Sequence, residues 1–262
     1  MMIVTTAPKA TETMMNKAKK AVQHFSATYI SREGASVRQM MDTYNEPLLI
    51  CESKRLLYYD GHQNNPFFFH PNSAMFRGKG FMNTRKDPLV NALRLEEGMK
   101  VADMTLGLAS DAVLASLAVG ETGKVFGTEA HPIVSYIVRE GLGTYETNRI
   151  ELTRAMRRIE VIGDTNLNWL MELKDESIDV IYFDPMFEAE VAGSSGMIPL
   201  KQLLNKSEKR DVLSRSIKEA KRVAKHRVVL KDHFRSERFK ELGFTKQIRP
   251  SATYHFGVWE KE

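Results

Sequence analysis

Cysteine is almost absent from this chain of 262 residues, which contains Cys51 alone. An internal disulfide and a cysteine-based metal cluster are therefore excluded. The chain also lacks an apolar run of about 18 residues, the length of a membrane span, and residues 1–6 lack the charged start and apolar middle of a secretory signal. These absences predict a cytoplasmic protein with no metal centre and no membrane association.

Positive charge is in only modest excess, because the formal net charge is +5 and the pI is about 9.1. This balance is compatible with a nucleic-acid partner without requiring one. The distribution is more informative, because residues 201–231 contain 11 Lys or Arg against 3 Asp or Glu. Such a stretch is either a surface that binds phosphates or the solvated face of an amphipathic helix.

From residue 100 onward, short apolar runs alternate with helical patterns, which is typical of βαβ units and a parallel sheet. An antiparallel hairpin follows at the end, because its two strands lie too close in sequence for a crossover helix. The pattern predicts an α/β, Rossmann-like, doubly wound sheet of about seven strands with the hairpin at one edge. The expected strands are residues 101–103, 124–129, 159–162, 177–184, 228–231, 245–248 and 254–259, and the expected helices are residues 110–117, 132–141 and 207–223.

Residues 1–85 do not continue this series. Their pattern predicts a separate, small α/β domain, a candidate for substrate binding, with a boundary anywhere from the turn-rich join at residues 60–66 to Pro88. Residues 86–262 form the larger domain. The expected elements of the first part are strands at residues 2–5, 47–51 and 56–59 and helices at residues 8–24 and 36–44. Residues 67–70, Phe-Phe-Phe-His, are either a platform for stacking a base or, in the interpretation we favour, a buried strand with a satisfied histidine.

Four of the expected strands of the larger domain end in an acidic residue, namely Asp103, Glu129, Asp164 and Asp184. In an open parallel sheet, ligands bind beyond the carboxyl ends of the strands. The turn at Gly107 lacks the G-x-G-x-x-G pattern that cradles a pyrophosphate, which argues against a nicotinamide dinucleotide. S-adenosylmethionine has no phosphate and fits better.

The chemistry of each acid suits a different part of that cofactor. Asp103 could receive the ammonium, Glu129 both ribose hydroxyls and Asp164 the adenine amine. The structural alternatives are a helix N-cap for Glu129 and a turn former for Asp164.

The segment Asp184-Pro185-Met186-Phe187 follows an apolar strand and suits methylation of a planar exocyclic amine. Such a nitrogen is a poor nucleophile because its lone pair is delocalised into the ring. Asp184 and the carbonyl of Pro185 could accept its protons, and Phe187 could hold the flat ring by stacking. The alternative is that Asp184 merely ends a buried strand and Phe187 fills core.

Taken together, these motifs resemble class I S-adenosylmethionine-dependent methyltransferases, and most closely the J-type guanine-N2 methyltransferases of small-subunit ribosomal RNA. The resemblance spans residues 85–235. It rests on Asp103-x-Thr105-x-Gly107-Leu108-x-x-Asp111-Ala112, Glu129-x-x-Pro132-x-Val134, Val180-x-Tyr182-x-Asp184-Pro185-Met186-Phe187 and Arg227-Val228-Val229-x-Lys231.

The resemblance implies a methyltransferase domain over residues 86–262, S-adenosylmethionine as cofactor and a guanine amine of RNA as substrate. It makes Asp184, Pro185 and Phe187 the catalytic candidates. The implied cofactor contacts are Asp103, Thr105, Gly107, Asp111, Glu129, Ala130, Asp164 and Asp184. The candidates for substrate binding are Met186, Phe187 and Lys231, together with Arg77 and Lys79. The last two belong to the basic segment at residues 77–80, which is either a flexible loop that binds phosphate or an ordinary surface turn.

The leading hypothesis is a methyltransferase acting on ribosomal RNA, with no metal and with the oligomeric state left open. The sequence departs from the family at Ala109-Ser110 and at Glu188-Ala189-Glu190, so two rivals stay open. One is a methyltransferase for a protein or small-molecule amine. The other is a non-catalytic RNA-binding protein with a vestigial cofactor pocket.

Overall fold

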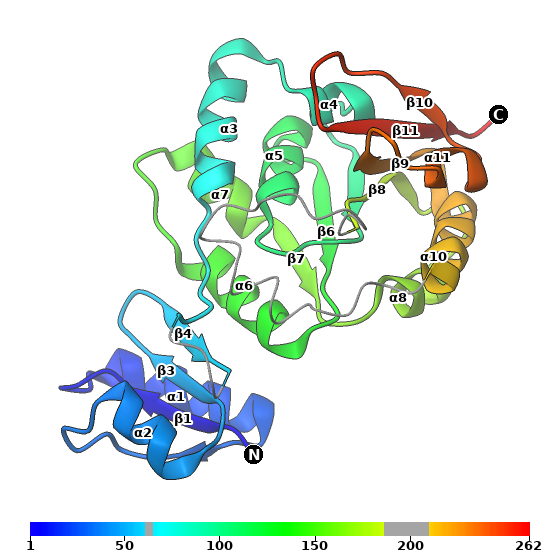
Figure 1. The fold of residues 1–262 in the computed structure, drawn as a ribbon. Coiled ribbons are helices and arrows are strands. Elements are labelled where there is room, and N and C mark those ends of the chain that lie inside the picture. Colours follow the sequence, from blue (N-terminus) through cyan, green and yellow to red (C-terminus); the bar gives the residue numbers. More distant parts are fainter. Residues whose placement is uncertain (61–64, 186–209) are drawn as a thin grey trace. The chain divides into compact units, whose positions relative to one another are not determined.

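A computed structural model describes residues 1–60, 65–185 and 210–262, and divides the chain into two compact units at His70 and Pro71 (Figure 1). The division falls before helix α3 (Asn72–Thr84) rather than near residue 85, because α3 packs against a helix of the second unit. The sequence pattern predicts no helix here, because Gly78 and Gly80 favour a turn.

The first unit is a four-stranded sheet in the order β2-β1-β3-β4, in which only β3 and β4 are antiparallel neighbours. Its apolar residues face a helix on each side, with Met14 and Ala18 of α1 buried on one and Met40 of α2 on the other. Its elements are β1 (Ile3–Thr6), α1 (Glu12–Phe25), β2 (Thr28–Tyr29), α2 (Val37–Tyr44), β3 (Leu48–Cys51) and β4 (Leu56–Tyr59).

The predicted burial of Phe67 is confirmed, but the segment 67–70 pairs with β4 only through an isolated bridge between Tyr58 and Phe67. Phe68 is partly buried and lies under the guanidinium of Arg55, 5.0 Å from its ring centre. Cys51 is fully buried.

The second unit contains the predicted seven-stranded sheet, in the order β10-β11-β9-β8-β5-β6-β7. Strands β5 to β9 are parallel, and β11 pairs antiparallel with β9 and β10, so the hairpin lies at one edge as expected. The strands are β5 (Lys100–Asp103), β6 (Lys124–Thr128), β7 (Ile159–Ile162), β8 (Ile178–Phe183), β9 (Ala224–His233), β10 (Thr245–Gln247) and β11 (Tyr254–Glu260).

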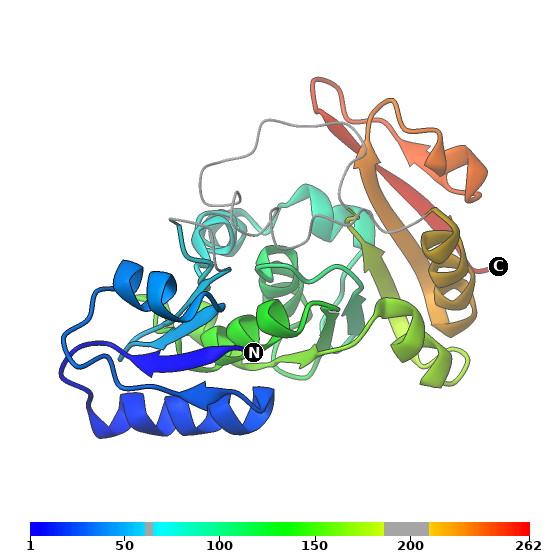
Figure 2. The same ribbon diagram turned by 60° about the horizontal axis from the view of Figure 1, so that its bottom comes forward.

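Helices cover both faces of this sheet (Figures 1 and 2). Besides α3, the helices in the described part of this unit are α4 (Pro88–Leu93), α5 (Ser110–Val119), α6 (Pro132–Thr144), α7 (Ile150–Arg157), α8 (Asn166–Glu172), α10 (Arg210–Val223) and α11 (Arg238–Glu241). Of these, α4, α7, α8 and α11 were not expected from the sequence, because each is short and its apolar period too brief to stand out.

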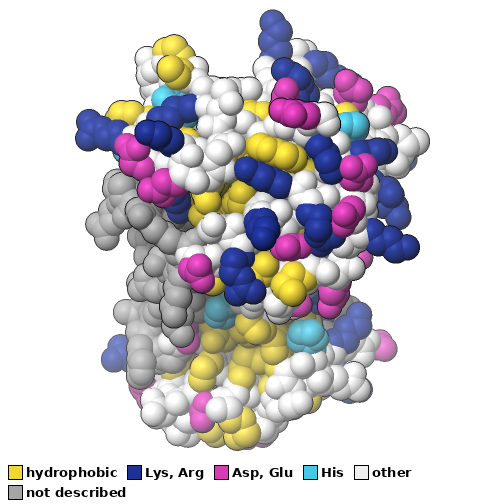
Figure 3. Space-filling view, turned by 90° about the vertical axis from the view of Figure 1, so that its right-hand side faces the viewer, with side chains coloured by type: hydrophobic (Ala, Val, Ile, Leu, Met, Phe, Trp, Pro, Cys, Tyr) yellow, Lys and Arg dark blue, Asp and Glu magenta, His cyan; other side chains and the backbone are white. Residues whose placement is uncertain are grey.

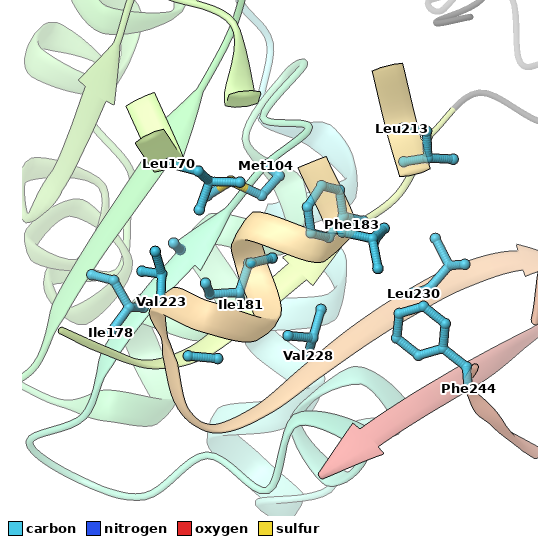
Figure 4. Close-up of a cluster of buried hydrophobic side chains, with 14 of the residues drawn as sticks. Met104, Leu170, Ile178, Ile181, Phe183, Leu213, Val223, Val228, Leu230 and Phe244 are labelled. Atoms are coloured by element: carbon cyan, nitrogen blue, oxygen red, sulfur yellow. The ribbon is translucent and has the colours of Figure 1, made fainter. Parts of the chain in front are cut away.

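Alternate residues of the strands build the two halves of the core. Ile181 and Phe183 of β8 face α8, α10 and α11, and Figure 4 shows them among the side chains of α10 and β9. Val180 and Tyr182 point the other way and pack under α3, α4 and α5. This alternation follows from the two-residue period of a strand, and it determines which side chains of β8 approach the site.

No helix in the described part of the chain is long and apolar enough to cross a membrane.

Candidate functional site

The carboxyl ends of the central strands lie side by side. Asp103 of β5 is level with Tyr182 of β8 on one side and with Gly127 of β6 on the other. The chain winds from β5 outward to β7 and then returns to β8, so the direction of winding reverses between β5 and β8. A ligand site is expected at this reversal.

The turn after β5 is tied to the end of β8 by Thr105. Its hydroxyl accepts a hydrogen bond from the backbone N–H of Asp184 (2.7 Å) and donates one to Oδ1 of Asp103 (3.3 Å). Gly107 (φ 46°) and Ala109 (φ 61°) both have left-handed backbone conformations. Ala109 is the N-cap of α5, and no side chain in the described part of the protein caps this helix.

Asp103 is 3 % exposed. Burial, reinforced by the nearby carboxylate of Asp111, raises its pKa to about 7, although hydrogen bonds from Thr105 oppose the shift. Its Oδ1 atom takes both of those bonds, whereas Oδ2 has no hydrogen-bond partner among the described residues.

Glu129 follows β6 and is 8 % exposed. Burial raises the pKa of its carboxyl group, and the backbone N–H groups of His131 and Gly107 donate hydrogen bonds that partly offset this rise. The bond from His131 measures 2.9 Å. Glu129 is thus oriented by the glycine turn, and the adjacent Ala130 is exposed.

Asp164 lies after β7, where its Oδ1 accepts hydrogen bonds from the backbone of Thr165 (2.6 Å) and the amide of Asn168 (3.0 Å). Thr165, not Asp164, is the N-cap of α8. Asp164 therefore stabilises the turn, and its contact with a cofactor stays a prediction.

Asp184 and Lys231 form a close ion pair, with 2.5 Å between Oδ2 and Nζ. Burial raises the pKa of Asp184 to about 6, while Lys231 opposes this shift. Burial alone would lower the pKa of Lys231, but Asp184 and Asp111 raise it overall. Lys231 thus pairs with the catalytic candidate, and its contact with substrate or phosphate stays a prediction.

Arg77 was expected on a basic loop, but it lies in the middle of α3. Its guanidinium forms ion pairs with Asp87 (3.0 Å) and Asp111. The two carboxylates raise the pKa of Arg77 against the effect of burial. Arg77 thus connects α3 to α5, whereas Lys79 on the same helix is exposed.

Tyr182 and Tyr254 also contact the site, although the sequence pattern predicts no role for either. The hydroxyl of Tyr182 donates a hydrogen bond to Asp111 (2.8 Å), and Nζ of Lys231 lies 4.8 Å from the ring centre of Tyr254. The sequence does contain one indication that Tyr182 lies near the site. Tyr182 precedes Asp184 by two residues, and residues two apart in a strand share a face. Pro185 is buried, and Met186 and Phe187 lie outside the described residues.

Much of the basic stretch is engaged within the protein. Arg222 pairs with Asp175 and Glu219, Arg227 with Glu260, and Lys221 donates to the carbonyl of Leu242. The face of the molecule in Figure 3 carries Lys and Arg side chains interspersed with acidic ones. A uniformly basic surface is therefore not found on this face.

The second unit combines a parallel sheet with buried carboxylates at its point of reversal and a glycine turn. Carboxylate oxygens accept hydrogen bonds from an ammonium and from ribose hydroxyls, so this donor set fits S-adenosylmethionine. Among the described residues, no group of three or more His, Cys, Asp or Glu side chains could hold a metal ion. The fold and the site define a Rossmann-like, S-adenosylmethionine-dependent methyltransferase.

The chain belongs to the family described as "Putative SAM-dependent methyltransferase", which matches residues 38–253. It is 42 % identical to the protein YpiP of Bacillus subtilis over 98 % of both chains. It is 27 % identical to ribosomal RNA small subunit methyltransferase J of Buchnera aphidicola, over 77 % of this chain and 84 % of that relative.

Among solved structures, the SAM-dependent methyltransferase NGO1261 from Neisseria gonorrhoeae has the same fold. Its TM-score is 0.59 at 18 % identity, with 98 % of this chain and 95 % of that chain covered. These comparisons agree with the predicted fold, and S-adenosylmethionine is the cofactor of the family.

Proposed function

We propose that this protein methylates an exocyclic amine of RNA, namely N2 of a guanine in small-subunit ribosomal RNA. The observation that carries the proposal is the position of Asp184 at the reversal point of the sheet, tied through Thr105 to Asp103. The curated relatives named ribosomal RNA small subunit methyltransferase J support the choice of substrate. Such a substrate implies a cytoplasmic location.

The cofactor contacts of the proposal follow from the available acceptors. Asp103 receives the ammonium at Oδ2, and Glu129 receives the ribose hydroxyls while Gly107 lets the backbone approach closely. Asp164, Thr105 and Ala130 line the same edge. Asp111 acts indirectly, because Arg77 and Tyr182 already engage its carboxylate.

S-adenosylmethionine, when bound, supplies a methyl group on a positively charged sulfur. The side chain of Asp184 is 27 % exposed, so it can accept a hydrogen bond from the incoming amine, as can the Pro185 carbonyl. This bond localises the lone pair on nitrogen as the nitrogen–carbon bond forms and the carbon–sulfur bond breaks. Asp184 then accepts the proton that nitrogen loses, and positioning contributes much of the rate.

Phosphate contacts complete the proposal. We assign them to Lys79, to the exposed cations of the stretch 201–231 and to the first unit. Such contacts are insensitive to sequence and weaken with salt. In the proposal, Phe187 and Met186 hold the flat base.

The test uses a small-subunit ribosomal RNA transcript made in vitro, which carries no modifications. Wild-type protein and S-adenosylmethionine should yield N2-methylguanosine, detected by mass spectrometry of the digested RNA. Asp184→Asn should lower the rate by about 100-fold or more and still bind S-adenosylmethionine in calorimetry. An unchanged rate in this variant would refute the proposed role of Asp184.

The substrate is tested separately. Ribosomal and transfer RNA from cells lacking the protein should lack one methylguanosine. If every RNA nucleoside is unchanged, and purified protein instead labels a protein or small amine in a salt-independent way, the RNA part of the proposal fails.

A further inference from the structure

The two oxygens of the Asp184 carboxylate have different environments. Oδ2 lies 2.5 Å from Nζ of Lys231, whereas Oδ1 makes no hydrogen bond to any of the described residues. The backbone N–H of Asp184 is held by Thr105 at 2.7 Å. Within the described part of the chain, one oxygen of Asp184 is thus fixed by Lys231 and the other has no donor.

Lys231 is itself held from other directions. Its Nζ is 3.8 Å from Oδ2 of Asp111 and 4.8 Å from the ring centre of Tyr254, a distance at which a cation is attracted to an aromatic face. Asp111 in turn pairs with Arg77 of α3 and accepts from the hydroxyl of Tyr182. A chain of contacts therefore runs from α3 through α5 and β9 to the end of β8.

We propose that Lys231 is a positioning residue, which fixes Oδ2 of Asp184 so that Oδ1 alone accepts the hydrogen bond of the target amine. This role rests on the proposed function of Asp184. In this role Lys231 does not touch the reacting atoms, because its ammonium is engaged by the carboxylates of Asp184 and Asp111.

Lys231 also keeps Asp184 in the form that accepts a proton. Burial raises the pKa of Asp184 to about 6, and the ammonium of Lys231 is the main group that holds it down. The carboxylates of Asp111 and Asp232 push it up. Among the described residues, the charged and titratable groups that face Asp184 are Lys231 and Asp232 of β9, Asp111 of α5, Asp103 of β5 and Tyr182 of β8.

The experiment compares Lys231→Met, Lys231→Gln and Lys231→Arg with a matched control, Lys225→Met. Lys225 lies near the other end of the same strand, exposed. The titration of Asp184 is followed by carbon NMR of aspartate-labelled protein and assigned with Asp184→Asn. The pH dependence of kcat and KM is measured on the ribosomal RNA transcript.

Without the ammonium, the pKa of Asp184 should rise by about one unit or more, in both Lys231→Met and Lys231→Gln. The apparent pKa of the acidic limb in the pH profile of kcat should rise by the same amount, and KM for RNA should change less than twofold. Lys231→Arg should restore most of the wild-type profile, and Lys225→Met should match wild type throughout.

An unchanged pKa of Asp184 in Lys231→Met and Lys231→Gln would overturn the proposal. A kcat that falls by the same factor at every pH, with no shift of the pH profile, would overturn it as well. Calorimetric binding of S-adenosylmethionine shows that each variant is folded. If the transcript is not a substrate even for wild type, the proposed function fails, while the NMR titration still decides the role of Lys231.

Discussion

Asp103 is a buried carboxyl group whose pKa of about 7 lies within the range of ordinary assays. We propose that it must be ionised to receive the ammonium of S-adenosylmethionine. The cofactor affinity of wild type should therefore rise about tenfold between pH 6 and pH 8, the change in the ionised fraction of such a group. Asp103→Asn should bind weakly and lose this rise. Calorimetry at several pH values measures the difference, and equal pH dependence in both proteins would contradict the role.

Asp103 should also make the folding stability of the protein depend on pH, and this stability should fall with rising pH while the cofactor affinity rises. Its folded-state pKa is raised above the ordinary 3.8, so the stabilising contribution of the neutral form is fully present below that value and is lost as pH rises through about 7. Relative to Asp103→Asn, wild type without cofactor should lose melting temperature between pH 5 and pH 8. Thermal denaturation of both proteins tests this, and parallel curves would show that Asp103 titrates normally.

Glu129 allows a cleaner test of cofactor binding, because its carboxylate is oriented by two backbone N–H groups. Glu129→Gln should weaken S-adenosylmethionine binding by about 10- to 100-fold, the value of one or two hydrogen bonds to a charged group. The control is Glu160→Gln, an equal change of charge at an exposed position of β7. Calorimetry that finds both variants equal to wild type would remove Glu129 from the site.

Sequence patterns located these acids but not their partners. An apolar strand pattern followed by Asp or Glu can be recognised in the sequence. Asp103 and Glu129 could therefore be placed at one edge of the sheet, because parallel strands align their carboxyl ends. The pairing of Lys231 with Asp184 could not be predicted, since it joins residues 47 apart through a side-chain distance that no periodicity encodes.

At the scale of elements, helix α3 shows why local pattern failed. Arg77-Gly78-Lys79-Gly80 has the composition of a turn, but tertiary packing imposes a helix. A Cβ atom on Gly78 would lie 2.6 Å from a methyl group of Leu152 in α7. The glycine therefore lets α3 approach α7 and brings Arg77 to Asp111, a requirement that comes from another part of the chain.

Gly80 supplies a matched control on the same helix, because a Cβ there would meet nothing within 4 Å. Gly78→Leu should lower the free energy of unfolding by about 1 to 3 kcal/mol through overpacking. Gly80→Leu should raise it by about 0.5 kcal/mol, since leucine favours a helix more than glycine does. Denaturant titrations of the two variants measure the contrast, and similar stabilities would mean that α3 does not need this close approach.

At the scale of the whole molecule, alternation of strands and helices was enough to predict the large sheet and its edge hairpin. It did not place the boundary between the two units, because a helix without a clear apolar period lies at the join. The function of the first unit also has no signature in the sequence beyond basic helix α1, where Lys19 and Lys20 are exposed.

If the first unit contributes phosphate contacts, these two lysines provide the test. The double variant Lys19→Gln/Lys20→Gln should bind the ribosomal RNA transcript about tenfold more weakly at low salt, and the slope of log affinity against log salt should fall by about 1 to 2. Lys100→Gln/Lys124→Gln removes the same charge from exposed positions at the amino ends of β5 and β6, away from the site. This control variant should bind RNA like wild type, because the effect of Lys19 and Lys20 comes from local phosphate contacts and not from the net charge of the protein. Equal losses in both double variants would mean that only overall charge matters, and no loss in either would exclude α1 from the RNA interface.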